Sequence, residues 1–391
     1  MLRFMVRLVA MAGLPVLAAT AFASAPLSAA AATHETHIYV NDNTAGVNTI
    51  AAFTENADGS LTPVAGSPFT TGGAGKGAIV GSQGSIQATA DGRFILAVDA
   101  GSNKISVLRI RPNGSLAQVP GGTASSGGIE PISIAIHGDL VYVANEGDGT
   151  SGSNYTGFRL QVTGRLAPIA GSTVALPATA NPGDILFNST GKNLVGVEVG
   201  TTDPSTFRID SFAVGAGGLL TAASGSPFAA QSAGPFGSEF SPADPSRLYV
   251  SNAHAGAGNG TVSAFNVASS GSLSSIGGSP YADGQTAPCW VEVTHDGRYL
   301  FAVNTGSTTI SSYAIQADGS LAVLGSTPFK SGAGIRPFDA RVDPSGHFLY
   351  VVDAALDAVS AFAVSGGSLQ ELTGPPFALP SGATPFGVAT V

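Results

Sequence analysis

The chain has 391 residues, of which 10% are charged and 43% are hydrophobic, and 53 of them are glycine. This composition excludes a disordered chain, which would be poorer in β-branched and aromatic residues, and argues against long helices. The net charge is −9, and no Lys/Arg-rich run follows the N-terminal segment, so a nucleic-acid partner is excluded as well.

The first 32 residues are typical of a secretory signal peptide. Arg3 and Arg7 supply positive charge, an apolar stretch runs over residues 8–22, and A-x-A cleavage motifs stand at 21–23 and 30–32. We therefore predict a signal peptide over residues 1–32 and a secreted or periplasmic protein over residues 33–391. No later stretch reaches the roughly 18 apolar residues of a membrane helix, so we expect no membrane span after cleavage.

A repeat of about 50 residues fills the rest of the chain and indicates a propeller. Successive units start 48 to 53 residues apart, at Gln83, Pro131, Pro182, Pro235, Pro288, Pro337 and Pro385.

Each unit predicts four strands. A short inner strand, such as 291–293, is followed by a strongly β-prone second strand, such as 349–352, and by an alternating third strand, such as 309–315. A tight Asp-Gly-Ser-Leu turn (318–321) then leads into a fourth strand that ends near Gly-Ser-Pro-Phe (225–228). Proline suits that place because an outer edge strand tolerates a missing hydrogen-bond donor.

The two ends of the chain predict how the ring closes. The first unit begins with its second strand, 37–40, and the residues that open the other units recur at 385–390. We therefore predict an all-β fold, a seven-bladed β-propeller of four-stranded blades, in which the C-terminal strand completes the N-terminal blade. Closure of this kind removes open sheet edges.

The Tyr-Val-x-Asn runs at 142–145 and 249–252, followed by Asp-Gly-Ser-Leu turns, resemble the lactonase-like seven-bladed propellers. That family includes bacterial 6-phosphogluconolactonases and fungal carboxymuconate-lactonising enzymes. The resemblance covers essentially all of the predicted mature chain, and it implies the propeller fold and a lactone-hydrolysing activity.

The sequence departs from the enzymatic members of that family, which carry Pro-Arg-His at the start of one inner strand and Val-Asn-Glu at the end of the next strand. Pro235-Phe236-Gly237 stands where the first pattern is expected, and Asn145-Glu146 is the one Asn-Glu pair that remains. This departure and the export signal favour a ligand-binding or scaffold protein. A lactone hydrolase acting on an extracellular sugar lactone or a related lactone is the alternative.

Alternation along the inner strands predicts a polar site at the central channel. Residues two and four positions after each unit start lie on one face of the strand, toward the axis. In blades four to seven these positions hold most of the polar side chains, which gives the candidate ligand site Asp184, Glu239, Trp290, Glu292, Asp339 and Arg341. We expect Arg341 to pair with Glu292 and to leave Glu239 available. The same residues could instead form an internally paired cluster that binds nothing.

The loop after the second strand of blade three is a weaker metal candidate. Asn145, Glu146 and Asp148 carry oxygen atoms that suit Ca²⁺, although the loop lacks the spacing of an EF-hand. We expect no required cofactor, a small-molecule, glycan or protein ligand, and a monomer.

Overall fold

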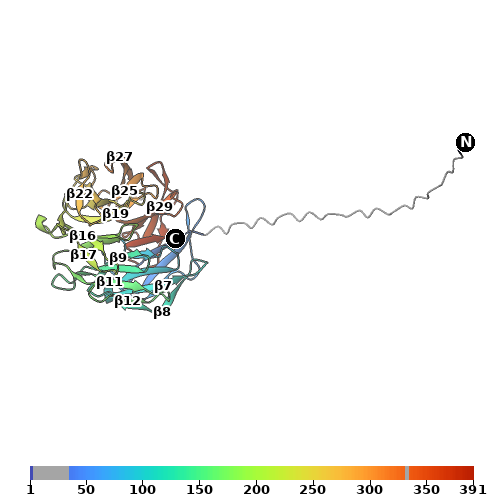
Figure 1. The fold of residues 1–391 in the computed structure, drawn as a ribbon, viewed down its shortest axis with the longest axis horizontal. Coiled ribbons are helices and arrows are strands. Elements are labelled where there is room, and N and C mark those ends of the chain that lie inside the picture. The colour runs from blue at the N-terminus through green and yellow to red at the C-terminus, as the bar shows by residue number, and fades with distance from the viewer. Residues whose placement is uncertain (3–34, 331–333) are drawn as a thin grey trace. The chain divides into compact units, whose positions relative to one another are not determined.

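Seven antiparallel sheets follow one another along the chain in the computed structural model, which describes residues 1–2, 35–330 and 334–391. All of the sheets belong to the unit Glu35–Val391, in which the colours pass from blue through green and yellow to red around the ring of blades (Figure 1). The predicted seven-bladed propeller is confirmed. The predicted signal peptide lies outside the described residues, apart from its first two. Within the described ranges, no helix has the length and hydropathy to cross a membrane.

The first four blades run from the inner strand outward as follows. Blade one has β33 (Gly387–Thr390), β1 (His37–Asn41), β2 (Gly46–Glu55), β3 (Leu61–Pro63) and β4 (Phe69–Gly75). Blade two has β5 (Ile86–Ala88), β6 (Phe94–Asp99), β7 (Lys104–Ile110) and β8 (Leu116–Ser125), with the 3₁₀ turn η1 (Ala100–Ser102). Blade three has β9 (Pro131–His137), β10 (Leu140–Asn145), β11 (Asn154–Leu160), β12 (Leu166–Pro168) and β13 (Val174–Ala175). Blade four has β14 (Pro182–Phe187), β15 (Asn193–Glu198), β16 (Arg208–Val214), β17 (Leu220–Ala222) and β18 (Phe228–Ala229), with η2 (Pro204–Thr206).

The last three blades follow the same plan. Blade five has β19 (Pro235–Phe240), β20 (Arg247–Asn252), β21 (Thr261–Val267), β22 (Leu273–Ser275) and β23 (Tyr281–Ala282). Blade six has β24 (Pro288–Val293), β25 (Tyr299–Asn304), β26 (Thr309–Ile315) and β27 (Leu321–Pro328). Blade seven has β28 (Pro337–Val342), β29 (Phe348–Asp353), β30 (Ala358–Ser365), β31 (Ser368–Glu371) and β32 (Phe377–Ala378).

The ring closes through the two ends of the propeller, as predicted. β33 pairs antiparallel with β1, with Val388 opposite Val40, and His37 and Val391 exchange backbone hydrogen bonds of 2.9 and 3.0 Å. In Figure 1 the C-terminus lies where the blue and red ends of the colour range meet. The blade that starts the chain therefore depends on its last residues.

The Tyr-Val-x-Asn motif has a structural role between blades. The Tyr142 hydroxyl donates to the carbonyl oxygen of Gly218 at 2.7 Å, which ties the second strand of blade three to the turn between the third and fourth strands of blade four. Tyr350 donates to Gly59 at 3.0 Å and makes the same connection across the ring closure. These glycines have positive φ values of 83° and 80°, which a side chain would disfavour.

The Gly-Ser-Pro-Phe motif interrupts the outer strand rather than ending it. In blade four, β17 and β18 lie on either side of the motif and both pair with β16. At the gap, the Ser226 hydroxyl accepts the backbone N–H of Ser211 at 3.0 Å. This bond replaces a ladder bond that the interrupted strand no longer supplies, which explains why serine precedes the proline.

Candidate functional site

A plug segment, Val80–Gly84, crosses the axis of the ring on the face where the inner strands begin, which we call the upper face. The Ser82 hydroxyl donates to the carbonyl oxygen of Ile132 at 2.7 Å, and the Gln83 backbone N–H donates to Gly183 at 2.9 Å. The Gln83 side chain reaches the far side of the ring and bonds the backbone of Val291 in both directions, at 3.0 and 3.2 Å. This use of Gln83 explains why β5 begins at Ile86 rather than at Gln83.

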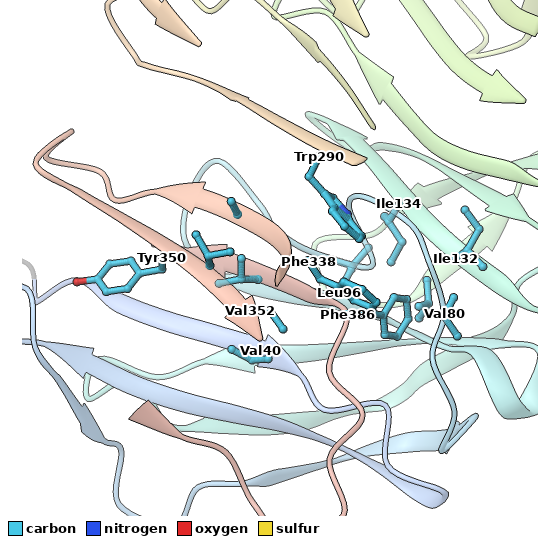
Figure 2. Close-up of a cluster of buried hydrophobic side chains, with 14 of the residues drawn as sticks. Val40, Val80, Leu96, Ile132, Ile134, Trp290, Phe338, Tyr350, Val352 and Phe386 are labelled. Atoms are coloured by element: carbon cyan, nitrogen blue, oxygen red, sulfur yellow. The ribbon is translucent and has the colours of Figure 1, made fainter. Parts of the chain in front are cut away.

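Trp290, on β24, packs against this plug and does not face a polar channel. Its ring is packed between Phe236 and Phe338, with centroid distances of 5.2 and 4.7 Å, and its Nε1 donates to the carbonyl oxygen of Ser82 at 2.8 Å. The side chain is 1% exposed. Figure 2 shows Trp290, Phe338, Phe386 and Val80 in one apolar cluster. The upper end of the axis is therefore closed by hydrophobic side chains.

The five charged residues of the predicted channel site lie below the plug, where the structure brings them together. A cavity of about 170 Å³ is lined by residues that include Gln87, Asp184, Glu239 and Arg341. Arg341 Nη1 lies 2.7 Å from Glu292 Oε2 and 3.4 Å from Glu239 Oε2. Arg341 therefore pairs mainly with Glu292, as expected, and the exposed fifth of the Glu239 side chain (22%) faces the cavity.

Asp184 and Asp339 fasten neighbouring inner strands to one another. Asp184 accepts hydrogen bonds from the hydroxyls of Ser133 and Ser238, at 3.0 and 2.8 Å, and so links blades three, four and five. Asp339 accepts the backbone N–H of Val388 at 3.3 Å and links blade seven to the C-terminal strand. Both carboxyls are buried, and their contacts account for them as structural groups.

A second polar cavity, of about 200 Å³, lies on the upper face. Its charged lining residues are Lys76, which follows β4, Glu130, which precedes β9, and Glu146, which follows β10. The wall is completed by Ile79, the plug residues 80–81, Asn181, Pro182, Val199 and Phe236. We call it the upper cavity. The sequence singled out Glu146 for a metal loop, but it gave no signal for Lys76 or Glu130, which lie in irregular segments between blades.

Backbone hydrogen bonds position the segments that carry the charged groups of the upper cavity. The Glu146 N–H donates to the carbonyl oxygen of Glu130 at 2.8 Å, and the Lys76 N–H donates to Asn43 Oδ1 at 2.7 Å. The Lys76 ammonium forms an ion pair with Glu130. Burial raises the pKa of Glu146 above its usual value, and the neighbouring Glu130 adds to this, while Lys76 lowers it. Glu146 is thus a carboxyl with increased basicity near a cation that is paired with Glu130.

The predicted calcium loop uses its three residues in separate ways. The Asn145 amide donates to Ser126 and Asn154, while Asp148 is exposed and accepts the N–H groups of Thr150 and Ser151. Glu146 lines the upper cavity. Across the described ranges, no group of three or more His, Cys, Asp or Glu side chains could hold a metal ion. Calcium binding by this loop stays a prediction.

Comparison with known proteins assigns the family. Residues 28–187 and 239–385 match the model of a family described as lactonase, 7-bladed beta-propeller. The chain belongs to this lactonase family. None of the curated proteins matches the chain in sequence.

Solved structures share the fold of this lactonase-family propeller. A putative 6-phosphogluconolactonase from Bacteroides uniformis superposes with a TM-score of 0.71 at 21% identity, covering 92% of this chain and 100% of that one. The periplasmic gluconolactonase PpgL of Pseudomonas aeruginosa gives a TM-score of 0.66 at 18% identity, covering 91% and 99%. At these identities the likeness shows the fold alone.

The axial cluster of this lactonase-family propeller leads to a paired prediction. Burial and the nearby Glu292 raise the pKa of Glu239 to about 8, so Glu239 is mostly protonated at neutral pH, and Glu239→Gln replaces a neutral group with a neutral group. Glu292→Gln instead leaves the buried Arg341 poorly paired, which we expect to cost about 2–4 kcal/mol of unfolding free energy. Denaturant unfolding near neutral pH should show this loss for Glu292→Gln and a change below about 1 kcal/mol for Glu239→Gln. Equal losses in the two variants would contradict the assignment.

The same cluster predicts that this propeller loses stability as the pH rises. Burial raises the pKa of Asp184 to about 7 and that of Asp339 to about 6, beside the raised value of Glu239. The folded protein therefore holds protons that the unfolded chain has already released, and this stabilisation is lost as the pH rises through the folded pKa values. We expect the melting temperature to fall by about 5 °C or more between about pH 5 and pH 8.5. A melting temperature that is constant or rises over this range would refute the prediction.

Proposed function

We propose that this lactonase-family propeller hydrolyses a neutral lactone in the upper cavity. The observation that carries the proposal is that Glu146, a carboxyl of raised pKa, and the Lys76 ammonium, which is paired with Glu130, lie on the wall of one cavity. Two groups promote ester hydrolysis by water. A general base of raised pKa takes a proton from the water, and a nearby cation stabilises the negative charge that forms on the carbonyl oxygen. Membership of the lactonase family supports this reading over the ligand-binding or scaffold role that the sequence favoured.

The reaction follows from the chemistry of these two side chains. The Glu146 carboxylate takes a proton from a water molecule, whose oxygen then attacks the carbonyl carbon of the lactone. The carbonyl electron pair moves onto oxygen, and the Lys76 ammonium stabilises the resulting negative charge. When the carbonyl re-forms, the ring C–O bond breaks, and the protonated Glu146 returns its proton to the departing alkoxide. One lactone and one water give one hydroxy acid.

The charges of the upper cavity support a neutral rather than a phosphorylated substrate. Two carboxyls, Glu130 and Glu146, face one ammonium, Lys76, so the described charged lining carries no surplus positive charge for a phosphate group. Phe236, on this wall, stands where the family pattern of the enzymatic members would place arginine. Phosphate recognition depends on arginine or on clustered donors, so an unphosphorylated sugar lactone or a related lactone fits better.

We also propose that the protein acts outside the cytoplasm, with residues 1–32 as its export signal. The charge and apolar pattern of that segment supports this, as does a neighbour in structure whose name describes it as periplasmic. Fractionation of cells producing the full chain should place a product shortened at its N-terminus in the periplasm or the medium. A full-length product in the cytoplasm would overturn export.

The experiment that tests the proposed activity is a substrate panel with purified residues 33–391. Glucono-δ-lactone, galactono-γ-lactone, muconolactone and 6-phosphogluconolactone are followed by acid release, with buffer rates subtracted. We expect saturable turnover of a neutral lactone, with kcat/KM at least about 10-fold above that for the phosphorylated lactone. No acceleration over buffer with any lactone would overturn lactone hydrolysis and leave a binding role. A preference for 6-phosphogluconolactone, or for muconolactone with its carboxylate, would overturn the neutral substrate class.

A further inference from the structure

The repeat allows equivalent positions in different blades to be compared, and one pair of positions recurs with the same chemistry. The last residue of the second strand is polar, and a hydroxyl residue follows on the third strand. In blade two, the Ser106 hydroxyl donates to Asp99 at 2.6 Å, and in blade five the Asn252 amide donates to Ser263 at 2.9 Å. The hydroxyl positions of blades two, three, five, six and seven are Ser106, Thr156, Ser263, Ser311 and Ser360.

Blade four departs from this pattern with two carboxyls. Glu198 ends its second strand, and Asp210 stands at the hydroxyl position of its third strand. Glu198 is 3% exposed and Asp210 is 5% exposed. Burial and the neighbouring Asp210 raise the pKa of Glu198, so the two carboxyls share a proton near neutral pH.

Two further residues that lie beside these acids also differ from the residues at the equivalent positions of other blades. Tyr155 of blade three stands where blades two and four to seven carry Ile or Val, such as Ile105 and Val262. Its hydroxyl donates to Asp210 Oδ2 at 3.0 Å. The hydroxyl passes over Gly196, at a position that holds Ala or Val in blades two, three and five to seven. A Cβ atom at Gly196 would collide with this hydroxyl. Four adjoining positions of blades three and four thus depart from the repeat, and their residues are in contact: Tyr155 with Asp210 and Gly196, and Asp210 with Glu198.

Of these four residues, Glu198 and Asp210 line a cavity of about 420 Å³ between blades three and four, which is separate from the upper cavity. Its mouth includes the exposed residues Ala175, Pro177 and Ser205. Apart from Asp210, no polar group of the described residues bonds the Glu198 carboxyl, so one face of a side chain that is almost fully buried is left for the cavity. Volumes of about 300–1,000 Å³ are usual for small-molecule sites.

We propose that this inter-blade cavity binds a neutral polyhydroxylated ring, such as one monosaccharide unit of a glycan. The proposal goes beyond lactone hydrolysis and does not depend on it.

The lining matches the chemistry of a sugar. The carboxyl pair can accept and donate hydrogen bonds to vicinal hydroxyls, and Arg208 adds donors on the same wall. Arg208 also balances the single negative charge of a pair that shares one proton, so a neutral ligand fits better than an ion. Leu176 and Phe212 supply apolar surface for the C–H face of the ring.

The test compares the mature protein with a variant in which both acids are removed. Glu198→Asn with Asp210→Ser reproduces the Asn252–Ser263 pair of blade five, so the strands retain a pairing that this fold already uses. Glucose, galactose, mannose and N-acetylglucosamine are titrated by calorimetry and by ligand-observed NMR, up to about 50 mM, because single-sugar affinities are expected in the millimolar range. Calcium chloride is titrated in parallel.

We expect saturable binding of at least one of these sugars, weakened at least about 10-fold in the double variant, with lactone turnover unchanged. If the double variant does not fold, Glu198→Leu keeps Asp210 with Tyr155 and should show the same loss. Equal binding by the wild type and the variant would overturn the proposal, as would absence of binding by the wild type. Binding of calcium in place of the sugars would also overturn it, and altered stability without binding would mark the four residues as an internal hydrogen-bond network.

Discussion

Replacing Glu146 with glutamine is expected to lower kcat for the best lactone by about 100-fold or more, because general-base catalysis contributes roughly that much and the amide cannot accept the proton. The fold should be unaffected, since the backbone bond from Glu146 to Glu130 does not involve the side chain. The wild-type rate should also rise with pH along a limb set by Glu146. That limb lies above the range of an ordinary carboxyl, because burial and Glu130 raise the pKa of Glu146.

The matched control is the same change in the axial cluster. Glu239→Gln also converts an acid of raised pKa into an amide, but in the cavity on the other side of the plug. Steady-state kinetics on both variants should show the loss for Glu146→Gln and near-wild-type turnover for Glu239→Gln. The reverse result would place the reaction in the axial cavity.

Deleting residues 386–391 is expected to prevent stable folding or to lower the melting temperature by more than about 10 °C. The deletion removes the inner strand of blade one together with Phe386 and Val388, both 0% exposed, and it leaves the backbone of β1 unpaired on one side. The loss of one large core side chain alone costs about 3–5 kcal/mol. Asp339 would also lose the N–H of Val388 that it accepts.

The control for this truncation is removal of Val391 alone. That change costs the two terminal backbone bonds with His37 and the packing of one half-buried side chain, so thermal melts should show a decrease of a few degrees at most. A protein lacking residues 386–391 that melts at the wild-type temperature would rule out closure of the ring by β33.

The fold could be predicted because successive repeat units show the same pattern of four strands. Five of the six inner strands expected to open with proline begin at that residue in the structure, as at Pro182 and Pro337, because the local sequence sets both the strand and its turn. The exception is β33, which begins two residues after Pro385. The side chains of Glu239, Glu292 and Arg341 could also be placed together, since strict alternation puts equivalent positions of neighbouring inner strands on one side. These predictions needed only local pattern and ring symmetry.

The features of the site that could not be predicted depend on segments that interrupt the repeat. Alternation placed Trp290 at the axis, but it could not show that residues 80–84 cross the ring there and bury the indole. The upper cavity depends on Lys76 and Glu130, which lie in connections between blades, and Glu130 has the positive φ value of 53°. Contacts of this kind join residues far apart in the chain, such as Ser82 and Trp290, and no local period indicates them.

The most direct test of lactone hydrolysis in the upper cavity is a crystal structure of the Glu146→Gln variant soaked with the lactone that the substrate panel selects. The account predicts an intact lactone ring in the upper cavity, with its carbonyl oxygen within hydrogen-bond distance of the Lys76 ammonium and its carbonyl carbon facing residue 146. Lactone bound beside Glu239 in the axial cavity, with the upper cavity free of it, would contradict the account.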